Sequence, residues 1–162
     1  KDSERRKSSI IVLNIILESL IKWFAPILSF TTEEIFTLIN EDKKSIHLEK
    51  FMEFPKSFEN ELLNKKWIEL KKIRDICNIS IEAKRASKEI GSSLEANLTI
   101  NLNKNLYKIS NNIDFSELCI TSSVIVEQSD KEEVIVKTTK AEGSKCPVCW
   151  KINKEKCERH SS

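Results

Sequence analysis

Hydrophobic residues recur at helical spacing in the first part of the chain. Between Ser8 and Phe24 an apolar position returns every three or four residues, which predicts an amphipathic helix. Its apolar stripe consists of Leu13, Ile16, Leu17, Leu20, Ile21 and Phe24. Pro26 is expected to stop this helix. Thr31 and Glu34 have the pattern of a capping box, which predicts Thr31 as the N-cap of a short second helix.

A longer helix is predicted from about Glu59 to Ile90, after a loop over residues 41–57. Apolar residues again return at helical spacing, whereas the last turns are basic and carry few apolar side chains. The apolar stripe consists of Leu63, Trp67, Leu70, Ile73, Ile76, Cys77 and Ile81. Gly91 is placed to close this helix, because glycine readily adopts the left-handed conformation of a C-cap.

The hydrophobic period changes in the second half of the chain. Apolar and polar residues alternate over residues 94–102, which predicts a strand, and residues 103–111 predict a short helix. The β-branched runs Val124–Val126 and Val134–Val136 predict two more strands, with a hairpin turn at Asp130–Glu132 between them. This order of elements indicates a compact α+β unit.

The chain is therefore predicted to be mainly α. Two glycines and three prolines in 162 residues are too few for a sandwich or barrel, which would need many turns. We expect three domains: a helical-bundle portion over residues 1–91, a small α+β connector over residues 92–140, and a C-terminal knuckle over residues 141–162.

The knuckle carries the motif with the clearest chemistry. Cys146 and Cys149 form a C-x2-C turn, and Cys157 and His160 form a C-x2-H turn after a loop of seven residues. Each short turn directs two donors at one point, and four such donors complete the tetrahedral sphere of a zinc ion, although ferrous iron suits the same donors. A closed sphere predicts a structural metal, without which this polar tail should be disordered.

The remaining features point to a soluble, non-catalytic chain. Cys77 and Cys119 are predicted to be small core residues, because the absence of a secretory signal indicates the reducing cytoplasm. Polar residues interrupt the apolar stretch Ile10–Leu28, which favours a buried core helix over a membrane span. We find no nucleophile paired with a base and no phosphate-binding glycine loop, so no catalytic residue is assigned. We expect a monomer.

Positive charge gathers in two blocks, although the net charge is only +2. Residues 65–89 carry 8 Lys or Arg against 4 Asp or Glu, and residues 137–162 carry 7 against 3. Such blocks indicate a polyanionic partner, although ordinary solvated faces would give the same pattern. The candidate RNA-binding residues are Lys84, Arg85, Lys88, Lys145, Trp150, Lys151, Lys154, Lys156 and Arg159. Trp150 either stacks on an unpaired base, or packs over the metal site or onto the α+β unit.

Four stretches occur in order along the chain: Ile21–Thr31 (IKWFAPILSFT), Glu82–Arg85 (EAKR), Gly91–Ala96 (GSSLEA) and Lys140–Trp150 (KAEGSKCPVCW). Together they resemble the bacterial-type isoleucyl-tRNA synthetases, which are class I aminoacyl-tRNA synthetases. The first stretch is shared with the valyl- and leucyl-type enzymes, whereas the Cys-Pro-x-Cys-Trp ending selects the isoleucyl type.

The resemblance implies a ligase that joins isoleucine to its tRNA with ATP and magnesium. The His-Ile-Gly-His and Lys-Met-Ser-Lys-Ser motifs of the family's catalytic core do not occur here, so a C-terminal part that grips the anticodon stem and loop is expected. Its partners would be tRNA and the rest of the synthetase chain. The resemblance carries the metal role onto Cys146, Cys149 and Cys157, whereas the family usually has a second C-x2-C turn where this chain has His160.

Two other functions fit the same residues. A DNA-binding module could end in a related cysteine knuckle, although the helix-two-turn-helix region that accompanies such knuckles is not found here. A helical adaptor could use the knuckle to dock a protein, and it would then have no affinity for nucleic acid. An independent enzyme is the reading that the sequence favours least.

Overall fold

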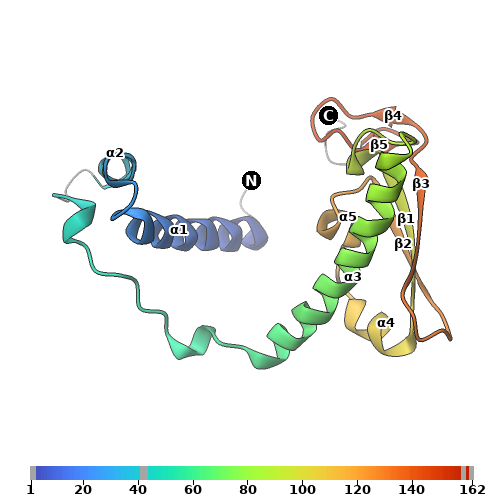
Figure 1. Ribbon diagram of the computed structural model, residues 1–162, viewed down its shortest axis with the longest axis horizontal. Helices are drawn as coiled ribbons and strands as arrows, with labels where there is room; N and C mark the ends of the chain where they lie inside the picture. The colour runs from blue at the N-terminus through green and yellow to red at the C-terminus, as the bar shows by residue number, and fades with distance from the viewer. Residues whose placement is uncertain (1–2, 41–43, 158–159, 161–162) are drawn as a thin grey trace. The chain divides into compact units, whose positions relative to one another are not determined.

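The computed structural model describes residues 3–40, 44–157 and 160. The chain divides into two compact units, Lys1–Glu59 and Asn60–Ser162 (Figure 1). The hydrophobic period changes only after Gly91, but the long helix before that point packs on the sheet that follows it. None of the described helices has a continuous apolar stretch of the length that a membrane span needs.

Over residues 3–40 and 44–59, the first unit is built from α-helices and short 3-10 turns. They are α1 (Glu4–Phe24), α2 (Ser29–Ile39), η1 (Ile46–Leu48) and η2 (Lys56–Phe58). Helix α1 begins earlier than its apolar pattern predicts, because the Ser3 side chain accepts a hydrogen bond from the N–H of Arg6 and caps it. The small core of the unit consists of Ile21, Ala25, Phe36 and Ile46.

The predicted capping box of the second helix is wrong. Helix α2 begins at Ser29 without a side-chain cap, so Thr31 lies inside the helix and cannot be its N-cap. The physical reason is the short connection between the helices. The N–H of Leu28 already donates to the carbonyl of Phe24 at 2.7 Å, which leaves no extended residue before Thr31.

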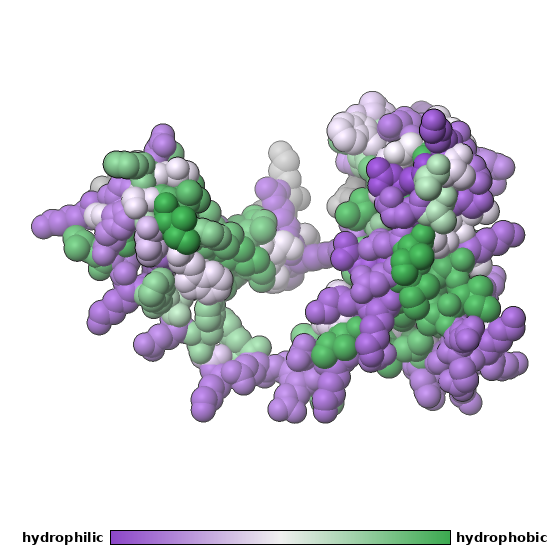
Figure 2. Space-filling model, in the orientation of Figure 1, coloured by the Kyte–Doolittle hydropathy of each residue, from purple (hydrophilic) through white to green (hydrophobic). Residues whose placement is uncertain are grey.

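Most of the apolar stripe of α1 is exposed in this unit, contrary to the expectation of a buried core helix. Among the described residues, α2 and η1 supply the main packing against α1. The side chains of Leu13 and Phe30 are 63% and 93% exposed, and Figure 2 shows apolar surface over this unit. The set that we call the apolar face is Ile10, Ile11, Val12, Leu13, Ile16, Leu17, Leu20, Trp23, Phe24, Ile27, Leu28, Phe30, Leu38 and Ile39.

The second unit is a sheet with helices packed on it. Helix α3 (Glu61–Ala86) packs on the sheet, mainly against strand β3 (Figure 1). The other elements are η3 (Ser93–Glu95), β1 (Ala96–Leu102), α4 (Lys104–Ser110), α5 (Phe115–Leu118), β2 (Ser123–Gln128), β3 (Ile135–Lys140), β4 (Ser144–Lys145) and β5 (Ile152–Asn153). The predicted order of strand, helix, strand and strand is confirmed, with α5 as an additional short helix.

The predicted hairpin at Asp130–Glu132 is wrong, because β2 and β3 do not pair with each other. The sheet order is β2-β1-β3, with β1 parallel to β2 and antiparallel to β3. The long connection between β1 and β2 contains α4 and α5, and such a crossover is what a parallel pair requires. Strand β3 therefore joins the other edge of β1, where Ala96 faces Lys140.

The core of the second unit lies between α3 and the sheet. Leu98, Ile100 and Leu102 are buried on alternate positions of β1, as the period of two predicts. Cys77 and Cys119 are both buried, which confirms their prediction as core residues. The hydrogen bond with the Cys119 thiol, together with burial, holds the pKa of Cys77 far above its ordinary value. Cys77 therefore stays a neutral thiol.

The predicted glycine C-cap of the long helix is also wrong. Helix α3 ends at Ala86, and Lys88 rather than Gly91 takes the left-handed conformation, with φ 59°. The N–H of Lys88 donates to the Arg85 carbonyl at 3.0 Å, and the N–H of Glu89 donates to the Lys84 carbonyl at 3.1 Å. This is the bond pattern of a Schellman motif, formed here around a lysine.

Candidate metal centre and basic surface

The four predicted metal ligands lie in and directly after a tight hairpin in the second unit: Cys146 and Cys149 are in the turn between strands β4 and β5, and Cys157 and His160 follow β5. Strands β4 and β5 pair antiparallel, with Ser144 opposite Asn153. The entry to this hairpin requires a glycine. Gly143 has φ +130°, and a Cβ at this position would overlap the carbonyl oxygen of Asn153. The N–H of Cys146 donates to the Lys151 carbonyl at 2.9 Å, which closes the turn between the strands.

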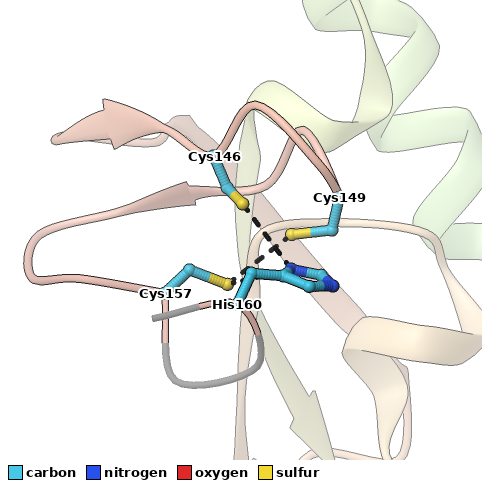
Figure 3. A group of neighbouring side chains, drawn as sticks. All are labelled: Cys146, Cys149, Cys157 and His160. Carbon is cyan, nitrogen blue, oxygen red and sulfur yellow. Dashed lines mark hydrogen bonds between the residues drawn. The ribbon is translucent and has the colours of Figure 1, made fainter. Parts of the chain in front are cut away.

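The structure brings all four donor atoms to one point (Figure 3). Their ligand atoms lie within 4.8 Å of one another. The sulfurs of Cys149 and Cys157 are 3.7 Å apart, and Nδ1 of His160 lies 3.6 Å from the sulfur of Cys146 and 3.5 Å from that of Cys157. Zinc bond lengths give tetrahedral edges of about 3.8 Å between sulfurs and about 3.6 Å between sulfur and nitrogen. The spacing therefore fits a four-coordinate ion.

The electrostatics of the site favour a cation among the sulfurs. The backbone N–H groups of Cys149 and Val148 lower the pKa of Cys146 to about 6, assisted by the side chains of Cys149 and His160. At Cys149 the N–H of Lys151 lowers the pKa, but desolvation and the neighbouring sulfurs together raise it. Adjacent thiols resist joint ionisation unless a cation lies between them. With four protein donors, such an ion would have no open position for catalysis.

The predicted RNA-binding residues near this cluster differ in their surroundings. Lys145, Trp150 and Lys156 are exposed, and in the described part of the chain neither lysine forms an ion pair. Lys154 is exposed and lies 3.6 Å from a carboxylate oxygen of Glu142. Lys151 is only 20% exposed, and its ammonium contacts the connector. The predicted contact at Arg159 lies outside the described residues.

The second group of predicted RNA-binding residues lies at the end of α3. Lys84 pairs with the Glu89 carboxylate at 2.8 Å, and Arg85 pairs with Glu82 at 2.7 Å. Lys88 is exposed at the left-handed position. Arg85 and Lys88 line an open hollow of about 510 Å³ beyond the end of the helix. Because these ion pairs are solvent-exposed, they are weak and can exchange for phosphate contacts.

Comparison with known proteins identifies the family. Residues 1–100 match the family model described as the anticodon-binding domain of tRNA ligase. The chain belongs to this family. It is 79% identical over 161 residues to the isoleucine–tRNA ligase of Pelagibacter ubique. The matched region covers 99% of this chain and 18% of that protein.

More distant relatives carry the same name. The isoleucine–tRNA ligase of Agrobacterium fabrum is 34% identical over 93% of this chain and 17% of its own length, and that of Bartonella henselae is 35% identical over 94% and 17%. The chain therefore spans less than a fifth of these ligases. The anticodon-binding family match ends within β1, whereas the ligase relatives also cover most of the residues beyond it.

The segment that carries the four candidate ligands, which we call the metal turn (residues 141–160), is joined to the α+β connector by residues that the sequence does not single out. Ser122 accepts a hydrogen bond from the N–H of Ile152 at 2.6 Å, and Ser116 accepts one from the ammonium of Lys151 at 3.1 Å. Asp114 caps helix α5 through the N–H of Ser116. The Asp-x-Ser pattern of this cap is visible in the sequence, but its contact with Lys151 depends on the fold.

Proposed function

We propose that this chain is the tRNA-binding, C-terminal part of an isoleucine–tRNA ligase, which would join isoleucine to its tRNA with ATP and magnesium. The observation that carries the proposal is the match of residues 1–100 to the anticodon-binding domain of tRNA ligases. The ligase relatives, which extend over the metal turn, support it. The catalytic steps would belong to the remainder of the ligase, and the part described here would hold the anticodon stem and loop.

The metal in this proposal is one structural zinc ion, held by Cys146, Cys149, Cys157 and His160. The donor spacing and the soft, borderline character of three sulfurs and one imidazole support zinc over magnesium or calcium. Bound zinc would fix the two turns against each other. The contacts with RNA would come from protein side chains, because the turn would present Trp150 and the neighbouring lysines to the RNA.

Contacts with tRNA would divide into two kinds. Lysine and arginine side chains would contact phosphates and set the position of the stem, and exposed Trp150 would stack on an unpaired base. The proposed phosphate contacts are Lys84, Arg85, Lys88, Lys145, Lys154, Lys156 and Arg159. Each such contact on a duplex stem adds about 0.9 to the slope of log affinity against log salt.

The apolar face of α1 and α2 would be covered by the preceding part of the same ligase chain. The first of the relatives is more than five times longer than the segment matched by this chain, so a longer ligase chain would contain residues that could cover this face. Among the residues of this unit that the structure describes, four buried apolar residues form a small core, whereas fourteen large apolar side chains lie open on α1, on α2 and on the turn between them. We propose that this face is an internal interface of the full-length protein.

A comparison of tRNA binding with DNA binding tests this function directly. Binding of isoleucine tRNA, an unrelated tRNA and duplex DNA to the full-length ligase would be measured by fluorescence anisotropy over a range of salt concentrations. We expect preference for isoleucine tRNA, affinity that falls with salt, and weaker binding after truncation following Lys140. Equal affinity for DNA would favour the DNA-binding module, and no nucleic-acid binding at all would favour the adaptor.

A further inference from the structure

In the described residues, the metal turn is fastened to the α+β connector at three separate points. The N–H of Ala141 donates to the Glu95 carbonyl at 2.7 Å, where the chain leaves β3. The N–H of Ile152 donates to the Ser122 hydroxyl at 2.6 Å. The third point is the ammonium of Lys151, and it is the one made by a charged side chain from the turn itself.

The surroundings of Lys151 are those of an anchored side chain. Its ammonium donates to the Ser116 hydroxyl at 3.1 Å and lies 3.5 Å from a carboxylate oxygen of Glu117. The Ser116 hydroxyl in turn donates to Asp114 at 2.8 Å. The hydrogen bond from Ser116 is the main cause of a lowered pKa at Asp114, to which Lys151 adds its charge. This network holds the ammonium at the start of helix α5.

Trp150, the residue directly before Lys151, has an unusual backbone. Its φ is 64°, a left-handed conformation that a bulky residue adopts only when its surroundings impose it. On one side its own N–H donates to the Cys146 carbonyl at 2.9 Å, and on the other side lies the anchored Lys151. The side chain of Trp150 nevertheless remains 60% exposed. Backbone strain at a residue with an exposed aromatic side chain is typical of a side chain whose position is fixed before it contacts a ligand.

We propose that Lys151 is a positioning residue for tRNA recognition, which fastens the metal turn to helix α5 and thereby fixes the backbone that presents Trp150. It therefore differs from its neighbours Lys154 and Lys156, which are both exposed. The ion pair of Lys154 with Glu142 is solvent-exposed and weak, so this ammonium too can contact phosphate. This inference rests on the proposed tRNA-binding function. It assigns Lys151, Ser116 and Asp114 to one device that acts on RNA only through Trp150.

Three single variants of the full-length, metal-loaded ligase separate positioning from direct contact. Lys151→Met removes the ammonium, and Ser116→Ala removes the nearer of its two acceptors without changing any charge. In Ser116→Ala the Asp114 cap keeps its hydrogen bonds from the N–H groups of residues 116 and 117. Lys154→Met removes a neighbouring exposed charge as the matched control. Metal content and thermal unfolding confirm that each variant is folded.

Each variant is combined with Trp150→Ala, and tRNA affinity is measured against salt. Stacking on a base contributes about 1–3 kcal/mol, so we expect Trp150→Ala to weaken tRNA binding about 5- to 150-fold. Lys151→Met and Ser116→Ala should each weaken tRNA binding by part of that factor and leave the salt dependence of binding unchanged. In a protein that already carries Trp150→Ala, neither substitution should weaken binding further. Lys154→Met should instead lower the salt slope by about 0.9 and add fully to Trp150→Ala.

Two results would overturn the inference, and they are distinguishable. If Ser116→Ala binds tRNA normally while Lys151→Met lowers the salt slope, Lys151 contacts phosphate and the positioning role fails, but the tRNA-binding function stands. If Trp150→Ala and the truncation after Lys140 both bind tRNA normally, the metal turn does not recognise RNA, and both proposals fail together.

Discussion

At the residue scale, backbone conformation identifies positions that composition alone does not distinguish. The chain has two glycines, and only Gly143 needs to be one. Gly91 was expected to be the special glycine, yet it has ordinary space around it: a Cβ there would lie 3.5 Å from the carboxylate of Glu95. The left-handed positions at Lys88 and Trp150 carry large side chains instead.

Substitution of the two glycines by alanine should therefore have opposite consequences. Gly143→Ala would place a Cβ against Asn153 in a left-handed region, and we expect a loss of roughly 1–3 kcal/mol in the stability of the hairpin. Gly91→Ala should be neutral or stabilise by up to about 1 kcal/mol. Chelator competition reports the metal affinity of each variant, and thermal unfolding reports its stability. A Gly143→Ala protein with unchanged metal affinity would contradict the assignment of this glycine.

At the element scale, periodicity identified α1, α3, α4 and the three main strands, because burial on one face leaves a regular mark in the sequence. It could not give the order of the strands. Two β-branched runs with a polar turn between them predict a hairpin, and only the crossover through α4 and α5 shows that both pair with β1 instead. The four-residue helix α5 is too short to leave a period.

The candidate metal site was easier to predict from the sequence than the helix ends were. Two chelating turns are local, so their spacing alone brought Cys146, Cys149, Cys157 and His160 together as predicted. Metal binding itself stays a prediction. The end of α3 was missed because its Schellman motif is built around Lys88, and a lysine gives no sequence signal for a left-handed residue.

The strain at this helix end can be measured. Lys88→Gly should stabilise the second unit by about 1 kcal/mol, since glycine adopts the left-handed conformation without the penalty of a Cβ. The matched control is Lys71→Gly, an exposed position inside α3, where glycine should cost about 1 kcal/mol. Thermal unfolding shows whether each variant is more or less stable than the unsubstituted protein. Destabilisation by both would mean that residue 88 is not left-handed in solution.

At the scale of the whole molecule, the two units differ in how complete they are. The second has a continuous core between α3 and the sheet, whereas the first leaves its apolar face open. This difference agrees with the small share of the ligase relatives that the chain covers. The proposed internal interface makes the first unit dependent on sequence that precedes it in the full-length protein.

Self-association tests this dependence. The sequence alone predicts a monomer, but the exposed apolar face leads us to expect that the isolated 162-residue chain forms oligomers or aggregates in sedimentation velocity experiments, because such a face associates in water. The double substitution Leu13→Glu and Phe30→Glu should reduce this association. In the full-length ligase the same two substitutions should instead destabilise the protein by several kcal/mol, by burying charge in an interface. A monodisperse chain with a cooperatively folded first unit would argue against the interface.

The central claim is that a bound metal ion folds the C-terminal hairpin into a tRNA-binding surface, and metal analysis combined with tRNA binding tests it most directly. Metal content of the full-length ligase would be determined by elemental analysis, and tRNA affinity would be measured before chelation, after chelation and after zinc is restored. We expect one zinc ion per chain, a loss of about tenfold or more in tRNA affinity when the ion is removed, and recovery of that affinity when it is restored. A protein that holds no transition metal and still binds isoleucine tRNA with full affinity would contradict it.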